Sequence, residues 1–301
     1  MSIPLVRYEA AREVIAEGGL SLNDLHVHTS ASDGLTPPEE VVQRARETDL
    51  RVAIADHNVP DGAYAAWDAA GDEGFERIVP AIEVTTFERV HMLAYFRTPD
   101  DLEAFYLDVL RPHRRKHAHP TTPFDISVGE MLREAARWDG LTSAAHPFAV
   151  VRNGVMSVRK RHASIREDLA YLTAIEVHNG ADSAGNNRRA MRLARTFNKA
   201  ATAGSDAHIS GEIGAVMLAT PRGEDLFLSL RRRHAVVLDR ARGQLLSLLG
   251  HSAKLPFHLS RPVRRLRSMA REFNGEPEQE PPRRVKVRKG KGSWRERTVK
   301  R

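Results

Sequence analysis

Short apolar runs alternate with amphipathic stretches along the first 240 residues of the chain. Several of these runs contain no polar residue, as is typical of strands that are buried on both faces of a sheet. Strands are expected at residues 22–27, 52–55, 79–84, 91–96, 141–145, 174–177, 200–203, 215–219 and 235–238. The pattern predicts an α/β fold in which helices connect the strands of a largely parallel sheet.

Capping signals mark the beginnings of two expected helices. Thr36 precedes two prolines and Glu39, so that threonine can cap the helix and proline can fill its first turn. Ser127 and Glu130 form a second capping pattern ahead of a helix at 131–138. Further helices are expected at 101–110, 164–172, 187–198 and 224–232. About seven βα units in about 220 residues fit a barrel better than an open sheet, although periodicity alone does not decide closure.

Charge is divided unevenly along the chain. Residues 1–230 carry 25 Lys and Arg against 33 Asp and Glu, whereas residues 231–301 carry 21 against 6. The strand pattern ends near residue 250, and residues 262–273 can form a basic amphipathic helix. We expect an N-terminal helical segment at 1–20, a barrel at 21–240, and a basic extension at 241–301 that is disordered from about residue 275.

Composition excludes several kinds of site. The chain has no cysteine, which rules out disulfides, zinc–thiolate sites, iron–sulfur clusters and cysteine nucleophiles. No apolar run reaches the roughly 18–20 residues that a transmembrane helix needs. Residues 1–20 also lack the apolar core of a signal peptide, so a cytoplasmic location is expected.

Histidines and carboxylates gather at the ends of the expected strands. His26 and His28 stand two residues apart at the end of the first strand, and Asp206 and His208 repeat this spacing after a later one. Residues i and i+2 of a strand point to the same side, so each pair can converge on one metal ion. Further candidates at strand ends or just beyond them are Asp33, His57, Glu83, His91 and His146.

In a barrel these nine side chains would share the rim where active sites lie. Nitrogen and carboxylate ligands suit Mn²⁺, Fe²⁺ or Zn²⁺, and nine are enough for two or three ions. A single histidine at a strand end is most often an ordinary polar residue. The recurrence of such residues on successive strand ends favours a metal centre.

The motifs LHVHTSASDG, ADHN, AIEVTT with a following His, AHP and GSDAH resemble, in this order, those of the PHP (polymerase and histidinol phosphatase) superfamily over about residues 22–220. The resemblance implies a distorted (βα)7 barrel with a trinuclear metal centre that hydrolyses phosphate esters. It implies one ion on His26, His28, Glu83 and Asp206, a second on Glu83, His91 and His146, and a third on Asp33, His57 and His208. Asp33 stands where some members have His.

Metal chemistry suggests that a metal-activated hydroxide attacks phosphorus. Asp206 could orient this hydroxide or take its proton. His178 ends the same expected strand as Glu176 and is expected to point the same way, which makes it a candidate acid for the leaving oxygen; lining the pocket is its alternative role. Arg152 is the first candidate for binding the substrate phosphate, with Arg115 and Arg188 after it, and a solvated surface position is the alternative for each.

We expect the substrates to be nucleotides or short oligonucleotides, with two or three divalent ions, Mn²⁺ before Zn²⁺ or Fe²⁺, as cofactors. The alternatives are a histidinol-phosphate-type phosphatase of small metabolites and a non-catalytic module that binds metal or nucleic acid. Residues 251–301 carry 16 Lys and Arg against 5 Asp and Glu. Such a segment attracts polyanions by counterion release, so contact with nucleic acid is expected there. A solubilising end and an anionic lipid surface remain its alternatives.

Overall fold

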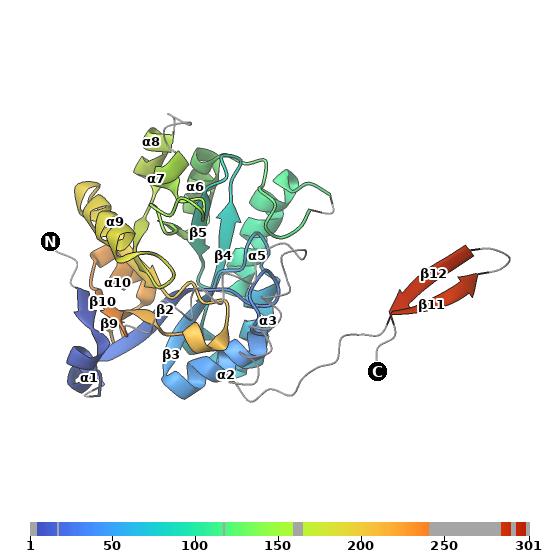
Figure 1. Cartoon of the computed structure of the whole chain (residues 1–301). Coiled ribbons are helices and arrows are strands. Elements are labelled where there is room, and N and C mark those ends of the chain that lie inside the picture. Colours follow the sequence, from blue (N-terminus) through green and yellow to red (C-terminus); the bar gives the residue numbers. More distant parts are fainter. Residues whose placement is uncertain are drawn as a thin grey trace. The chain divides into compact units, whose positions relative to one another are not determined.

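The computed structural model of the chain describes residues 5–16, 18–116, 118–158, 165–240, 284–289 and 293–298. The chain divides into two units, Met1–His251 and Ser252–Arg301. Figure 1 labels the elements along the sequence.

The first unit is built on one sheet with the strand order β1-β10-β9-β2-β3-β4-β5-β6-β7-β8. Its ten strands are β1 (Leu5–Arg7), β2 (Leu20–Val27), β3 (Leu50–Ile54), β4 (Ile78–Thr85), β5 (His91–Tyr95), β6 (Leu141–Ala144), β7 (Ala174–Asn179), β8 (Ala200–Gly204), β9 (Val216–Pro221) and β10 (Val236–Asp239). The sheet curls until the chain beyond β8 reaches β2, where Val27 and Ala207 form an isolated parallel bridge. The carboxyl ends of the first and last strands of this curl therefore meet.

The mixed α/β architecture predicted from the sequence is confirmed, and all nine expected strands are present. The count of seven βα units is not confirmed, because β5 and β9 run antiparallel to both of their neighbours. The connection from β4 to β5 spans only residues 86–90, which is too short for the helix that a parallel crossover requires. The strand β1, within the segment expected to be helical, pairs with β10 at the sheet edge.

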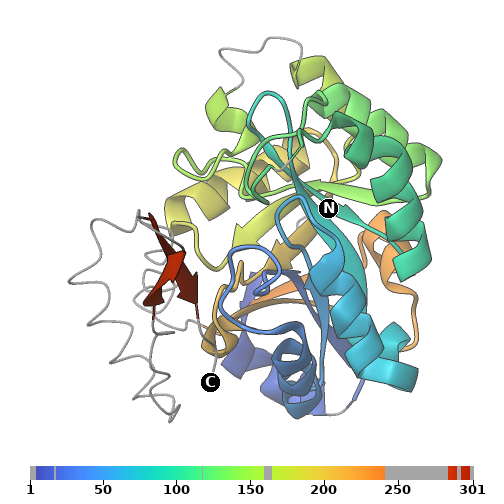
Figure 2. The same cartoon turned by 90° about the vertical axis from the view of Figure 1, so that its right-hand side faces the viewer.

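Helices lie on the outside of the curled sheet (Figures 1 and 2). They are α1 (Tyr8–Ala16), α2 (Pro38–Thr48), α3 (Asp61–Ala70), α4 (Gly74–Arg77), α5 (Pro99–Phe105), α6 (Val128–Arg137), α7 (Val155–Val158), α8 (Ile165–Asp168), α9 (Ala184–Thr196) and α10 (Leu226–Arg232). Ser127 caps α6 as predicted, because its hydroxyl accepts the backbone N–H of Glu130 at 3.2 Å. At α2 the residue before the helix is Pro37, and no side chain caps it, so the predicted Thr36 cap is not formed.

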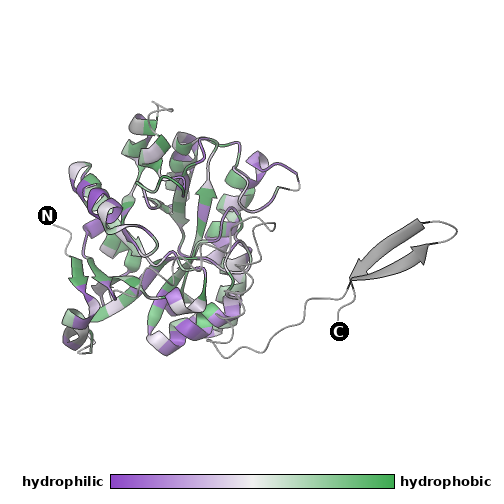
Figure 3. Ribbon diagram, viewed as in Figure 1, coloured by the Kyte–Doolittle hydropathy of each residue, from purple (hydrophilic) through white to green (hydrophobic). Residues whose placement is uncertain are grey.

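The core lies between the sheet and these helices. Strands such as β4 are buried along their whole length, and the largest fully buried side chains include Phe96, Phe105 and Phe124. Figure 3 shows hydrophobic residues on the strands and hydrophilic residues on the outer helices. In the part of the chain that the structure describes, no helix combines the length and the apolar character that crossing a bilayer demands.

In the second unit the structure describes two strands, β11 (Arg284–Lys289) and β12 (Ser293–Thr298), which pair antiparallel. They fall within the stretch for which the basic composition predicts disorder, from about residue 275. Valines at alternate positions 285 and 287 give the β-branched pattern that favours a strand. The predicted helix at 262–273 lies outside the described residues.

Candidate metal centre

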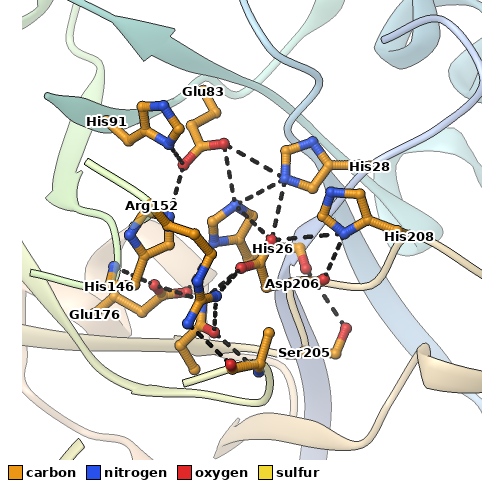
Figure 4. Close-up of polar contacts among 12 residues, drawn as sticks. His26, His28, Glu83, His91, His146, Arg152, Glu176, Ser205, Asp206 and His208 are labelled. Carbon is orange, nitrogen blue, oxygen red and sulfur yellow. Dashed lines mark hydrogen bonds and ion pairs between the residues drawn. The ribbon is translucent and has the colours of Figure 1, made fainter. Parts of the chain in front are cut away.

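Histidine and carboxylate side chains converge at the carboxyl ends of the central strands (Figure 4). His26 lies in β2, Glu83 lies in β4, and His91 begins β5. The chain leaving β2, β3, β6 and β8 supplies the others, which are His28, Asp33, His57, His146, Asp206 and His208. Seven of the nine are at most 3 % exposed, and His91 and Asp33 keep 12 % of their side chains exposed. The structure thus brings together all nine residues that the sequence predicted, and we refer to them as the candidate metal centre.

Three groups within the candidate metal centre have ligand atoms within 4.8 Å of one another. They are His26 with His28 and Glu83, His28 with Asp33 and His208, and His57 with Glu83 and His91. His146 joins through Nε2, 3.2 Å from Oε1 of Glu83, and Asp206 joins through Oδ1, 3.3 Å from Nε2 of His28. The grouping differs in part from the one implied by the family resemblance, because His57 lies with Glu83 and His91 as well as 3.5 Å from Asp33.

Buried polar atoms of the candidate metal centre face each other without bonding as donor and acceptor. Both carboxylate oxygens of Glu83 and Nδ1 of His91 are buried and make no hydrogen bond to any described residue. Oε1 of Glu83 is nevertheless only 3.1 Å from Nδ1 of His91. Buried polar groups are normally hydrogen-bonded, so nitrogen and oxygen lone pairs that converge in this way fit a shared cation. The donor set therefore suits divalent metal ions.

Burial controls the charge state of these histidines. Burial, followed by the nearby His208, lowers the pKa of His28 to about 3, and burial lowers that of His91 to about 4. Burial also opposes ionisation of Glu83, but the imidazoles around it outweigh that effect and hold its pKa well below the usual range. Neutral imidazoles beside an ionised carboxylate are the protonation states that bind a metal.

Glu176 supports the candidate metal centre from β7. Its Oε1 lies 2.9 Å from Nδ1 of His26, and its Oε2 accepts the backbone N–H of His146 at 2.6 Å. A carboxylate on the far nitrogen of a ligating histidine fixes the ring and its tautomer. From the sequence, Glu176 was considered only in relation to His178, and its supporting role was not predicted.

Two aspartates that the sequence analysis also missed hold the loops of the site. Asp24 accepts the N–H and hydroxyl of Ser205 at 2.8 and 2.6 Å and the N–H of Gly214 at 2.8 Å, which anchors the loop before Asp206. Asp56 accepts the N–H and hydroxyl of Thr29, at 2.8 and 2.6 Å, in the loop that leads to Asp33. Asp24 lies within β2 and Asp56 lies just after β3. A charged residue within or beside an apolar strand was the sequence signal that could have identified both.

Close backbone contacts bring the two ends of the curled sheet together at Gly204. A Cβ at this position would lie 2.5 Å from both N and Cβ of His26, so only glycine allows β8 to approach β2. Beyond it, Asp206 has a φ of 55°, and His146 has a φ of 24°. Two candidate ligands thus occupy backbone conformations that residues with a side chain rarely adopt.

His178 lies differently from its predicted position. A register shift in the pairing of β7 with β8 falls between Glu176 and His178, so the two do not follow simple alternation. Nε2 of His178 lies 3.6 Å from Asp239 on β10. Asn179 contacts the site instead, donating from Nδ2 to Glu176 at 3.0 Å and to Asp206 at 3.3 Å. The expectation that His178 points the same way as Glu176 is therefore corrected.

The three candidate phosphate-binding arginines occupy different places. Arg152 reaches the candidate metal centre, where it donates to Oδ2 of Asp206 at 2.6 Å and to Oδ1 of Asn179 at 3.2 Å. Arg115 is exposed and binds both carboxylate oxygens of Asp125, at 2.8 and 3.1 Å. Arg188 is exposed on α9. Only Arg152 among them has described contacts with the candidate metal centre.

The loop that carries Arg115 lies between α5 and α6 in the sequence and is attached to the rim of the candidate metal centre. Asn58, next to His57, donates from Nδ2 to the carbonyls of Pro120 and Thr122 at 2.6 and 3.0 Å. Arg114 donates to the carbonyl of Asn58 at 3.1 Å. The loop therefore borders the candidate metal centre through Asn58.

Comparisons with known proteins show what this chain is similar to. A family model described as PHP-associated matches residues 184–234. The 5'-3' exoribonuclease Rnm of Salmonella typhimurium is 28% identical over 138 residues, which are 43% of this chain and 45% of that protein. The chain is thus matched over less than half the length of this curated relative.

Solved structures share the fold. The lesion-specific endonuclease PfuEndoQ of Pyrococcus furiosus has a TM-score of 0.58 at 18% identity, over 74% of this chain and 60% of that one. A two-domain protein of Bacteroides vulgatus, containing a predicted PHP-like metal-dependent phosphoesterase, has a TM-score of 0.53 at 17% identity, over 79% and 68%. These comparisons support the family resemblance that the motifs carry: a PHP-associated family model matches residues 184–234, and the chain is similar in fold to these two solved structures.

Proposed function

We propose that this chain is a metal-dependent phosphoesterase that hydrolyses nucleotides or short oligonucleotides. The observation that carries the proposal is the convergence of buried histidine and carboxylate lone pairs on shared points, around Glu83 above all. A structural role alone gives no reason to collect so many metal-binding groups at one rim, where they are costly to bury.

Two or three divalent ions, Mn²⁺ first and Zn²⁺ or Fe²⁺ next, would be held by the nine residues of the candidate metal centre. When bound, such ions polarise phosphate oxygens and activate water near neutral pH. Which residues share each ion is part of the proposal, with Glu83 as the bridging group.

The protein's own groups would orient the reactants. Oδ1 of Asp206 faces His26 and His28, while its Oδ2 is held by Arg152 and Asn179. A carboxylate fixed on one side in this way suits the orientation of an attacking water, which is the role we propose for Asp206. Arg152, with 18 % of its side chain exposed, would contact the substrate phosphate. His178 stays a candidate acid for the leaving oxygen.

Nucleic-acid chemistry is favoured over small-metabolite chemistry by two observations. The curated relative is named as an exoribonuclease, and PfuEndoQ is named as an endonuclease. The basic extension, with 16 Lys and Arg against 5 Asp and Glu over residues 251–301, would add sequence-independent attraction for a polyanion.

The test is a hydrolysis assay on the full chain with metal analysis of the same sample. Chelator-stripped protein, and the same protein reloaded with Mn²⁺, would receive a mononucleotide, a 5'-phosphorylated RNA oligomer and histidinol phosphate. Release of mononucleotides from the oligomer, restored by Mn²⁺, is the expected result. Turnover of histidinol phosphate alone would support the small-metabolite alternative. A protein that binds Mn²⁺ at no stoichiometric site would overturn the proposal.

A further inference from the structure

The outer face of α9 carries a stripe of arginines. Arg188, Arg192 and Arg195 are exposed, while Asn187, Ala190, Leu193 and Ala194 on the opposite side of the helix are buried. At about 100° per residue, the three arginines fall within about 60° of one another around the helix axis. We call these three residues the α9 stripe, and Figure 3 shows hydrophilic residues along this helix.

The α9 stripe stands out because its charges are not balanced. Among the described residues, none of its three arginines forms a salt bridge, and α9 contains no Asp or Glu. Arginines on other helices do have acidic partners: Arg44 pairs with Glu47, Arg133 with Asp168, Arg137 with Glu134, Arg231 with Asp139 and Arg232 with Glu224. The first 230 residues carry 33 acidic against 25 basic side chains, so an unpaired basic stripe is unusual there.

The stripe begins beside the candidate metal centre. Oδ1 of Asn187 accepts the N–H of Asn179 at 3.1 Å, and Nδ2 of Asn187 donates to the carbonyl of Asn179 at 3.0 Å. Asn179 in turn contacts Asp206 at 3.3 Å. Arg188 directly follows Asn187 in the helix, and the stripe then continues for about 10 Å at about 1.5 Å per residue. That length accommodates about three phosphates of a stacked strand, at about 3.4 Å per nucleotide.

A neighbouring loop exposes apolar side chains. The guanidinium carbon of Arg189 lies 4.1 Å from the centroid of the Phe148 ring. This contact joins the loop after β6 to α9. The same loop exposes Val150 and Val151, at 79% and 93%. Unpaired bases offer apolar faces to such residues, whereas a free phosphate or a base-paired duplex does not.

We propose that the α9 stripe binds the phosphate backbone of a single-stranded polynucleotide whose reacting phosphate lies at the candidate metal centre. The inference rests on the proposed function and narrows its substrate to chains of several nucleotides. Arginine suits this task because its planar fork matches phosphate oxygens and stays charged. Arg188 would contact a phosphate next to the reacting one, and Arg192 and Arg195 would contact phosphates further along.

The test is binding of a fluorescent single-stranded RNA to the chelator-treated full chain, so that no turnover occurs. The test variant combines Arg188→Gln, Arg192→Gln and Arg195→Gln. The control variant combines Arg133→Gln, Arg137→Gln and Arg231→Gln, which removes the same charge from paired positions. The basic extension is present in every protein, so its contribution cancels in the comparison.

The quantity measured is the slope of the logarithm of the association constant against the logarithm of salt concentration. Each lost phosphate contact reduces the slope by about 0.7 for a single strand, so the stripe variant should lose about 2. The control variant should keep the wild-type slope. A wild-type slope in the stripe variant, or an equal loss in both variants, would overturn the inference. A wild-type protein that binds this RNA through the stripe but hydrolyses no ester would instead refute the proposed function alone.

Discussion

The carboxylate of Glu176 lies 2.9 Å from Nδ1 of His26, and this contact determines which ring nitrogen of His26 faces the candidate metal centre. The other nitrogen, Nε2, is 3.6 Å from Oε2 of Glu83 and 3.1 Å from Nε2 of His28. With Nδ1–H donated to Glu176, the lone pair of Nε2 is available to a metal ion. Burial opposes protonation of this ring, but the charges of Glu176, Asp206 and Glu83 outweigh it and raise the pKa of His26 well above its usual value, so a metal ion at Nε2 would have to displace a proton.

Replacement of Glu176 by Gln should therefore weaken metal binding without unfolding the protein. Gln keeps the volume but loses the charge that orients and polarises His26, and such losses cost about 10- to 100-fold in metal affinity. A Mn²⁺ titration of the chelator-stripped protein measures the effect. Glu103→Gln, an exposed change on α5, is the matched control and should bind like the wild type. Equal affinities in the two variants would show that Glu176 has no positioning role.

Glu83 is the carboxylate shared by two of the three ligand groups. Glu83→Gln should lower both the metal content and the turnover, because an amide nitrogen cannot replace a ligating oxygen. Loss of a residue that only supports a metal ligand lowers activity by up to about 100-fold. We therefore expect loss of the shared ligand Glu83 to lower turnover by more than about 100-fold. Elemental analysis and a phosphate-release assay on the same sample measure the two effects. Full metal content with full turnover would contradict the bridging role.

Arg152 joins Asp206, Asn179 and the carbonyl of Ala181 through one guanidinium. A hydrogen bond to a charged group contributes about 1.5–3 kcal/mol, so Arg152→Gln should lower kcat/KM by about 10- to 100-fold. Arg152→Lys should not restore it, because a point charge cannot serve these acceptors and a phosphate at once. Steady-state kinetics would be compared with those of Arg137→Gln, an exposed arginine on α6. Full activity of the lysine variant would show that the guanidinium of Arg152 is not required.

The sequence predicted the fold class and the members of the candidate metal centre because both depend on local patterns. Apolar runs mark buried strands, and His26 with His28 forms a spacing that strand geometry converts directly into a shared direction. The nine candidates lie together in the structure for this reason. Their roles as ligands remain a prediction that the experiments above test.

The supporting residues were missed because their roles depend on contacts between distant segments. Asp24 and Ser205 are separated by 181 positions, and only the curl of the sheet brings them together. The predicted direction of the His178 side chain was wrong because the prediction assumed that side chains alternate strictly between the two faces of the strand. In the structure the pairing of β7 with β8 shifts register between Glu176 and His178. A bulge of one residue leaves no clear mark in the sequence, yet it redirects every later side chain.

Asp225 provides a test of stability away from the candidate metal centre. Its Oδ1 caps α10 by accepting the N–H of Leu228 at 2.9 Å, and its Oδ2 accepts a hydrogen bond from Arg97 at 2.6 Å. Burial opposes ionisation, but Arg97 and the cap outweigh it and lower the pKa of Asp225 below its ordinary value of 3.8. Asp225→Ala should reduce the free energy of unfolding by about 0.5–2 kcal/mol at neutral pH, mostly through the lost cap, since Arg97 is partly exposed.

The pH dependence of this effect has a definite sign. Because the pKa is lower in the folded state, the unfolded chain binds the proton first as the pH falls. The contribution of Asp225 is therefore complete above the ordinary value of 3.8 and disappears as the pH falls through the lower folded value. Urea unfolding of chelator-treated wild type and variant across this range measures the difference. Asp68→Ala, an exposed change on α3, should stay within about 0.5 kcal/mol of the wild type. A difference between wild type and Asp225→Ala that grows as the pH falls would contradict the assignment.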